Sequence, residues 1–171
     1  MLSEVWTWVA GSSTADQLTT DEAPGARRSP SLIASSFDNM LYLLGGYGYT
    51  TSSEDRLSGL WKFNPLNSTF SFLKGDSTSL SYGNCSSLGH FAAGLFPPAG
   101  TARYSGFDSE GNLYFGGGWG QTCSGSVGYI GMLWKLTIPS LTFGWVAGSS
   151  LVNAAFTRLK CWRNLGFQSG L

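Results

Sequence analysis

Charged residues are scarce in this sequence. They make up 12% of its 171 residues, and ten basic side chains balance ten acidic ones, whereas a typical soluble domain is about 25% charged. This balance excludes a basic nucleic-acid-binding protein. No apolar run reaches the roughly 18 residues that a membrane-spanning helix needs, so we expect no membrane span. Residues 1–10 lack the basic start of a signal peptide, and none is expected there.

Residues that carry metal or catalytic chemistry are also few. His90 is the one histidine, and no acidic residue lies within ten positions of it, so the sequence shows no Ser-His-Asp arrangement. The three cysteines are Cys85, Cys123 and Cys161, and no Cys-x-x-Cys pair is present, which makes a zinc site unexpected. The paired carboxylates, at 21–22 and 54–55, lie in polar segments typical of a solvated surface. We therefore predict no catalytic residue, metal or cofactor in this chain.

Glycine and aromatic residues are abundant instead. The chain has 24 glycines and 15% aromatic residues, and this combination with few charges is typical of an all-β protein with many tight turns.

A repeat of about 73 residues organises the sequence. Leu-Trp-Lys-Phe at 60–63 recurs as Leu-Trp-Lys-Leu at 133–136, and Gly-Gly-Tyr-Gly at 45–48 recurs as Gly-Gly-Trp-Gly at 117–120. The blocks follow the same order in two units, which cover 24–76 and 98–150. The start of the chain, 1–13, reads like the end of a preceding unit, because Trp-Val-Ala-Gly-Ser-Ser occurs at 8–13 and again at 145–150. Residues 151–171 do not continue the repeat.

Each unit contains four short apolar runs separated by turn residues. They lie near 28–35, 40–45, 59–64 and 69–73 in the first unit, and near 103–107, 112–117, 131–137 and 142–147 in the second. Runs of this length, rich in Tyr, Phe, Trp and Leu and bounded by Gly, Asn, Ser and Pro, predict β-strands. Four antiparallel strands in a unit are typical of a propeller blade.

These segments resemble the kelch repeats of the galactose-oxidase-like β-propellers. The resemblance depends on Pro-Gly-Ala-Arg at 24–27, on the segments 41–49 and 60–65, and on the closing Trp-Val-Ala-Gly-Ser-Ser. It implies an all-β fold: a partial kelch-type β-propeller of two four-stranded antiparallel blades, plus one strand of a preceding blade near 5–9. Propellers have about 4–8 blades, so this chain cannot close a ring alone.

The repeat also marks structural residues. Glycine pairs at Gly45–Gly46 and Gly117–Gly118 are expected to let a neighbouring blade approach closely. We expect Trp61 and Trp134, in the third strand of each unit, to fill the gap between blades.

Four aromatic residues follow the glycine pairs. We expect Tyr47 and Trp119, which come directly after them, to pack between blades. Tyr49 and Tyr129 lie further into the loop and are candidates to contact a sugar or a protein partner.

The cysteines and the asparagines in glycosylation sequons bear on the cellular location of the protein. Both Cys85 and Cys123 fall in long loops, where they could form a disulfide or remain free thiols, and Cys161 would be left over. Two N-glycosylation sequons are present, at 67–69 and 84–86. Together these features favour an extracellular protein over a cytoplasmic one.

Three hypotheses for function follow. Kelch propellers are mostly interaction scaffolds, so the resemblance implies a binding module for a protein or glycan, without catalysis of its own. The chain could instead be a piece of a galactose-oxidase-like or carbohydrate-active enzyme with its catalytic residues in absent blades, or a non-functional truncation. Copper-radical chemistry in that enzyme group needs two histidines, and this chain has only His90.

Both ends of the array are expected to be open. They should bind the remaining blades or another copy of the chain, because each terminal blade has an apolar face without a neighbour. The 151–171 tail has helical apolar spacing. It would either cap one open edge or be unrelated to the propeller.

Overall fold

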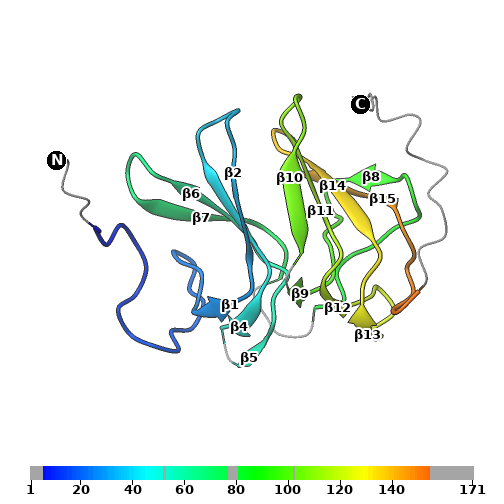
Figure 1. Ribbon diagram of the computed structural model, residues 1–171, viewed down its shortest axis with the longest axis horizontal. Coiled ribbons are helices and arrows are strands. Elements are labelled where there is room, and N and C mark those ends of the chain that lie inside the picture. The colour runs from blue at the N-terminus through cyan, green and yellow to red at the C-terminus, as the bar shows by residue number, and fades with distance from the viewer. Residues whose placement is uncertain (1–5, 52, 77–80, 102, 155–171) are drawn as a thin grey trace, which may run out of the picture.

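The structure is a computed structural model, and it describes residues 6–51, 53–76, 81–101 and 103–154. Within these ranges every helix or strand element is a β-strand, and the strands form antiparallel sheets (Figure 1). The predicted all-β class is thereby confirmed. No helix in the described part of the chain has the length and apolar character to cross a membrane.

The first unit forms a four-stranded antiparallel sheet. Its strands pair in the order β2 (Ser31–Ala34), β3 (Leu41–Leu44), β6 (Leu60–Asn64) and β7 (Thr69–Lys74). Each strand connects to the next in space, as the four apolar runs predicted. Asn39, in the β2–β3 turn, has φ 58°, a left-handed conformation that asparagine tolerates better than most residues.

The second unit repeats this sheet and adds an edge strand. The order is β10 (Tyr104–Phe107), β11 (Asn112–Gly116), β14 (Leu133–Thr137), β15 (Thr142–Ala147) and β8 (Phe91–Ala92). The four predicted runs supply the first four strands. The fifth, β8, comes from the segment between the units, and it pairs with the outer edge of β15.

A small three-stranded sheet accompanies each main sheet. In the first unit it consists of β1 (Arg27–Arg28), β4 (Tyr47–Tyr49) and β5 (Glu54–Arg56), and in the second of β9 (Gly100–Thr101), β12 (Trp119–Gln121) and β13 (Val127–Tyr129). Figure 1 shows both small sheets at the lower end of the molecule. The residues after each glycine pair therefore form a β-hairpin, although the sequence pattern indicated only a long loop.

The two main sheets pack through opposite faces. On the first, the side chains of Ile33, Tyr42, Leu44 and Leu60 join one hydrophobic core with residues of the second, namely Leu113, Phe115, Trp134, Leu136 and Phe143. The inner strands β2 and β10 lie side by side in Figure 1. The rings of Tyr42 and Phe107 meet edge to face, with centroids 5.5 Å apart. The Ser31 hydroxyl donates a hydrogen bond of 2.6 Å to the Arg103 carbonyl.

The predicted tryptophan pair is buried in both units. Trp61 and Trp134 are each 2% exposed. Trp134 lies in the core between the sheets. Trp61 faces the other side of the first sheet, where its ring meets Phe72 edge to face at 5.1 Å. The repeat therefore places equivalent residues on equivalent faces, and only one of these faces is covered by a second main sheet.

The glycine pairs form the corner between each main sheet and its small sheet. All four glycines have positive φ, from 62° at Gly45 to 104° at Gly46. A Cβ on Gly45 would lie 2.6 Å from the Gly100 carbonyl oxygen, and the Gly46 N–H donates to that same oxygen at 3.0 Å. The close approach expected of this pair is thus an approach of the second unit's β9 segment to the first unit's corner.

The ends of the chain depart from the prediction. Residues 6–9 are not part of any strand, and Trp6 is 99% exposed. The expected strand of a preceding blade near 5–9 is therefore absent over 6–9, because no strand in the described part of the chain pairs with these residues. At the other end, Val152 bridges to Ile130. The predicted helical spacing lies almost entirely outside the described residues.

Candidate functional site

The small sheets carry the candidate binding surface. Their strands alternate glycine with larger residues: Gly48 lies between two tyrosines, and Gly128 lies between Val127 and Tyr129. Gly48 and Gly128 are buried, and a Cβ on Gly128 would come within 2.8 Å of Val152. Only glycine fits on this inner side, so the larger residues lie on the more exposed face of each sheet.

A cationic row crosses the first small sheet. Arg28 pairs with Tyr47, and Tyr47 pairs with Arg56, so the three side chains lie on the same face. The Arg28 guanidinium carbon lies 4.7 Å from the centre of the Tyr47 ring, a cation–π distance. Arg56 is 3.6 Å from the Asp55 carboxylate, and its buried Nε has no hydrogen-bond partner. Two guanidinium groups thus flank one aromatic ring.

An aromatic row crosses the second small sheet at the equivalent positions. Trp119 pairs with Thr101 on one side and with Tyr129 on the other. The Trp119 and Tyr129 rings meet edge to face at 5.0 Å, and they remain 42% and 68% exposed. The Tyr129 backbone is held by Asn153, whose amide oxygen accepts its N–H at 3.1 Å. The pair is therefore a fixed aromatic surface that is open to solvent.

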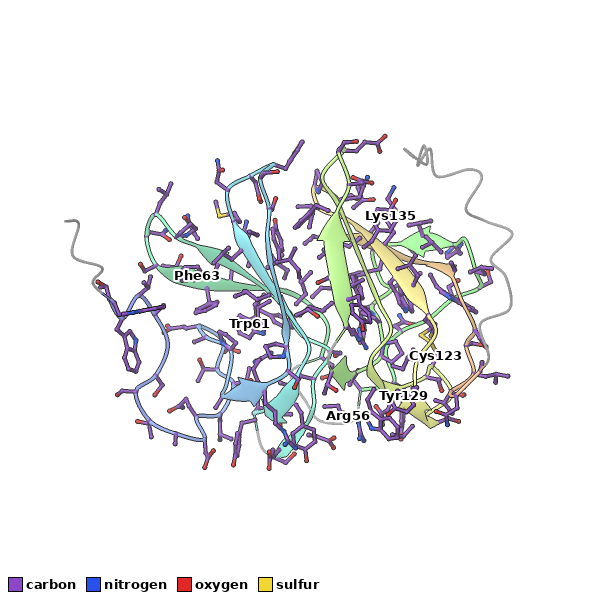
Figure 2. The ribbon with its side chains drawn as sticks, in the orientation of Figure 1. Arg56, Trp61, Phe63, Cys123, Tyr129 and Lys135 are labelled. Atoms are coloured by element: carbon purple, nitrogen blue, oxygen red, sulfur yellow. A yellow bond between two sulfur atoms is a disulfide. The ribbon has the colours of Figure 1, made fainter. Side chains whose placement is uncertain are left out.

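The two rows lie at the same end of the molecule. Figure 2 labels Arg56 and Tyr129, and both lie in the lower part of the molecule. The first and second small sheets are joined at the corner, where the Gly100 N–H donates to the Leu57 carbonyl at 3.1 Å. A ligand at this end could meet the exposed Arg28 guanidinium on one sheet and exposed aromatic rings on the other, whereas the Arg56 side chain is 18% exposed and paired with Asp55.

Half-buried Arg27 fixes the first small sheet to the main sheet. Its Nε donates to the Gly25 carbonyl and its Nη1 to the Gly45 carbonyl, each at 3.1 Å. Burial lowers the pKa of Arg27 to about 10, so the side chain remains charged at neutral pH. These two bonds tie the strand that carries Arg28 to the glycine corner.

Tyr49 and Tyr129 differ in their surroundings. Tyr129 is open to solvent, as expected of a ligand-contacting residue. Tyr49 is half-buried, and its carbonyl accepts the Thr19 hydroxyl at 2.7 Å. Partial burial, together with the carboxylates of Asp16 and Glu54, raises the pKa of Tyr49. The segment before the first unit therefore covers Tyr49, and it leaves Tyr129 uncovered.

The prediction that Tyr47 and Trp119 pack between blades is wrong. Neither side chain belongs to the hydrophobic core between the sheets or packs against it. The reason is the hairpin that follows each glycine pair, because it carries these rings away from the main sheets. The repeat pattern did not single out Arg28 and Arg56. The alternation of glycine with larger residues at 47–49, 119–121 and 127–129 could have identified the hairpin strands that position them.

Cys85 and Cys123 form a disulfide, with their Cα atoms 5.9 Å apart. The bond ties the segment between the units to the loop that joins β12 and β13, and both cysteines pack against the core. It therefore anchors the hairpin that carries Trp119 and Tyr129. Cys161 lies outside the described residues.

The other chemical candidates are placed as follows. His90 is exposed in the turn before β8. Within the described ranges, no group of three or more His, Cys, Asp or Glu side chains is placed to hold a metal ion. Of the sequon asparagines, Asn67 is exposed in the β6–β7 turn, where Thr69 donates to its side chain at 2.7 Å. Asn84 is also exposed, and its amide donates to the Gly94 carbonyl at 2.9 Å.

Comparison with known proteins adds no assignment. No protein-family model matches the chain, and no curated protein is similar to it.

Proposed function

We propose that this chain is a binding module without catalysis of its own, built as part of a kelch-type β-propeller. The repeated pairing of a four-stranded sheet with a small sheet supports the propeller assignment, as do the sequence blocks that resemble kelch repeats. The single observation that carries the binding function is the pair of equivalent rows on the small sheets. One presents Arg28, Tyr47 and Arg56, and the other presents Trp119 and Tyr129.

The chemistry of these rows favours an acidic glycan over a protein partner. Exposed aromatic rings offer flat apolar faces to a sugar ring, and guanidinium groups bind carboxylate or sulfate through directed N–H groups. Arg28 is exposed and its guanidinium lies over the Tyr47 ring; this contact limits the freedom that the side chain loses when it binds. An extracellular location agrees with this ligand class, and the Cys85–Cys123 disulfide supports it, because structural disulfides persist in oxidising compartments.

Titration calorimetry with sulfated and uronic-acid oligosaccharides tests the proposal, with a neutral oligosaccharide of equal length as the ligand control. We expect Tyr129→Ala and Arg28→Ala each to weaken binding by about tenfold or more, the size of effect found for a well-packed contact residue. Only the acidic ligands should lose affinity in Arg28→Ala. Leu66→Ala is the matched control, because Leu66 is 91% exposed in the β6–β7 turn. Equal affinity in all three variants, or no binding of any oligosaccharide, would refute the glycan proposal.

A further inference from the structure

The outer face of the first main sheet has the residue pattern of a buried interface. Its side chains come from alternate positions in β3, β6 and β7: Leu41, Leu43, Trp61, Phe63 and Phe70. The equivalent residues of the second sheet are Leu113, Phe115, Trp134, Leu136 and Phe143, and all of these are at most 2% exposed under the first sheet.

No second main sheet covers the same face of the first sheet. Trp61 and Phe63, at its centre, are nevertheless buried, at 2% and 8% exposed, and the other residues of the face are more open. Leu41, Leu43 and Phe70 are only half-buried, Phe72 is 40% exposed, and Leu32 at the inner strand is 64% exposed. We name this face the leading face and define it by Leu32, Leu41, Leu43, Phe70 and Phe72. A contiguous apolar surface of this kind on one sheet indicates a contact with another protein surface.

The outer face of the second main sheet is equivalent to the other face of the first sheet, the one that packs against the second sheet. We name it the trailing face and define it by Tyr104, Gly106, Tyr114, Gly116 and Lys135, which lie on one side of β10, β11 and β14. The equivalent residues of the first sheet are Ser31, Ile33, Tyr42, Leu44 and Lys62. Four of these, Ser31, Ile33, Tyr42 and Leu44, are at most 9% exposed against the second sheet. On the trailing face, Tyr104 is 85% exposed and Tyr114 is half-buried.

We propose that a second copy of this chain docks head to tail, with its trailing face on the leading face of the first. The contact inside the chain already joins the equivalent positions of these two faces, because the core lies between the trailing positions of the first sheet and the leading positions of the second. Of the trailing residues, Tyr114 and Lys135 are the same as their counterparts Tyr42 and Lys62 in the first sheet. Gly106 has no atom within 4 Å of an added Cβ, so the trailing face offers space for projecting residues such as Leu32 and Phe72. The net charge of zero does not oppose self-association.

The geometry of this contact limits the size of the assembly. A head-to-tail contact uses two different surfaces, so it continues from copy to copy until a ring closes. Each copy supplies two blade-like sheets, and propellers close with about 4–8 blades. The expected assembly is therefore a ring of about two to four chains.

Sedimentation velocity on the 171-residue chain and two face variants tests the contact. Tyr104→Ser removes the exposed ring from the trailing face and restores the residue that the first sheet has there. Leu43→Glu places a charge on the leading face, at the position where the second sheet has the buried Phe115. We expect the unaltered chain to form the ring and each variant alone to be a monomer or a short, weakly associated species. An equal mixture of the two variants should form a heterodimer, because one intact face remains on each partner.

Controls separate this result from misfolding and from other occupants. Leu66→Glu, in the β6–β7 turn outside both faces, should assemble like the unaltered chain, and near-ultraviolet circular dichroism should be the same for every variant. A monomer at the highest soluble concentration would overturn the proposal and leave the leading face to a different polypeptide. A stable homodimer of Leu43→Glu alone, or a mixture of variants that does not associate, would also overturn it.

Discussion

Removal of the Cys85–Cys123 disulfide should destabilise the protein strongly. The bond closes a loop with a sequence separation of 38 residues, and the chain-entropy relation for a loop of this length gives about 4 kcal/mol of stabilisation. For a domain of this size, 1 kcal/mol corresponds to a shift in Tm of about 2–4 °C. The double variant Cys85→Ala/Cys123→Ala should therefore melt about 8–16 °C lower than the unaltered protein.

Thermal melting by circular dichroism measures this effect, with and without a reducing agent. The reduced unaltered protein should melt near the double variant, because both lack the same cross-link. Cys161→Ala is the matched control, and it should keep both the original Tm and the original response to the reductant. A Tm that falls by less than about 2 °C in the double variant and under reduction would show that the bond does not restrain the unfolded chain, and the reasoning would fail.

Two further predictions concern the corners and the turns. In urea denaturation, Gly45→Ala should lower the free energy of unfolding by more than about 2 kcal/mol, because it combines a positive φ with a Cβ 2.6 Å from the Gly100 oxygen. Gly117→Ala should lower it by only about 1–2 kcal/mol, since its Cβ meets Tyr104 at an ordinary 3.4 Å. Gly106→Ala is the control and should leave the free energy of unfolding unchanged. At the β2–β3 and β10–β11 turns, burial raises the pKa of Asp38 and of Asp108, but hydrogen bonds from Tyr42 and from Asn112, among others, hold both below the usual value. The stability that these two carboxylates contribute should be complete above the unfolded pKa of about 4 and be lost as the pH falls through the lower folded pKa. In the double variant Asp38→Asn/Asp108→Asn, the free energy of unfolding should therefore fall less steeply between about pH 4 and pH 2. An unchanged slope of the free energy of unfolding against pH would contradict this role.

The sequence determined the secondary structure of the main sheets. The apolar runs and turn residues of each unit predicted the eight strands in order, because strands of 4–6 residues depend on local alternation and on nearby turn chemistry. The repeat also identified Trp61 and Trp134 as buried and Gly45–Gly46 as a position of close approach. These features are local, or are copied from one unit to the next, so they can be recognised without a partner.

Other features depended on contacts between distant segments, and only the tertiary structure decided them. The sequence left Cys85 and Cys123 open between a disulfide and free thiols, and their pairing depends on how the segment between the units crosses the second unit. Tyr47 and Trp119 were expected to pack between blades, but the hairpins carry them away from the main sheets, beside Arg28 and Tyr129. Residues 6–9 match the fourth strand of a unit in sequence, yet they form no strand, because a strand needs a neighbouring backbone to satisfy its hydrogen bonds.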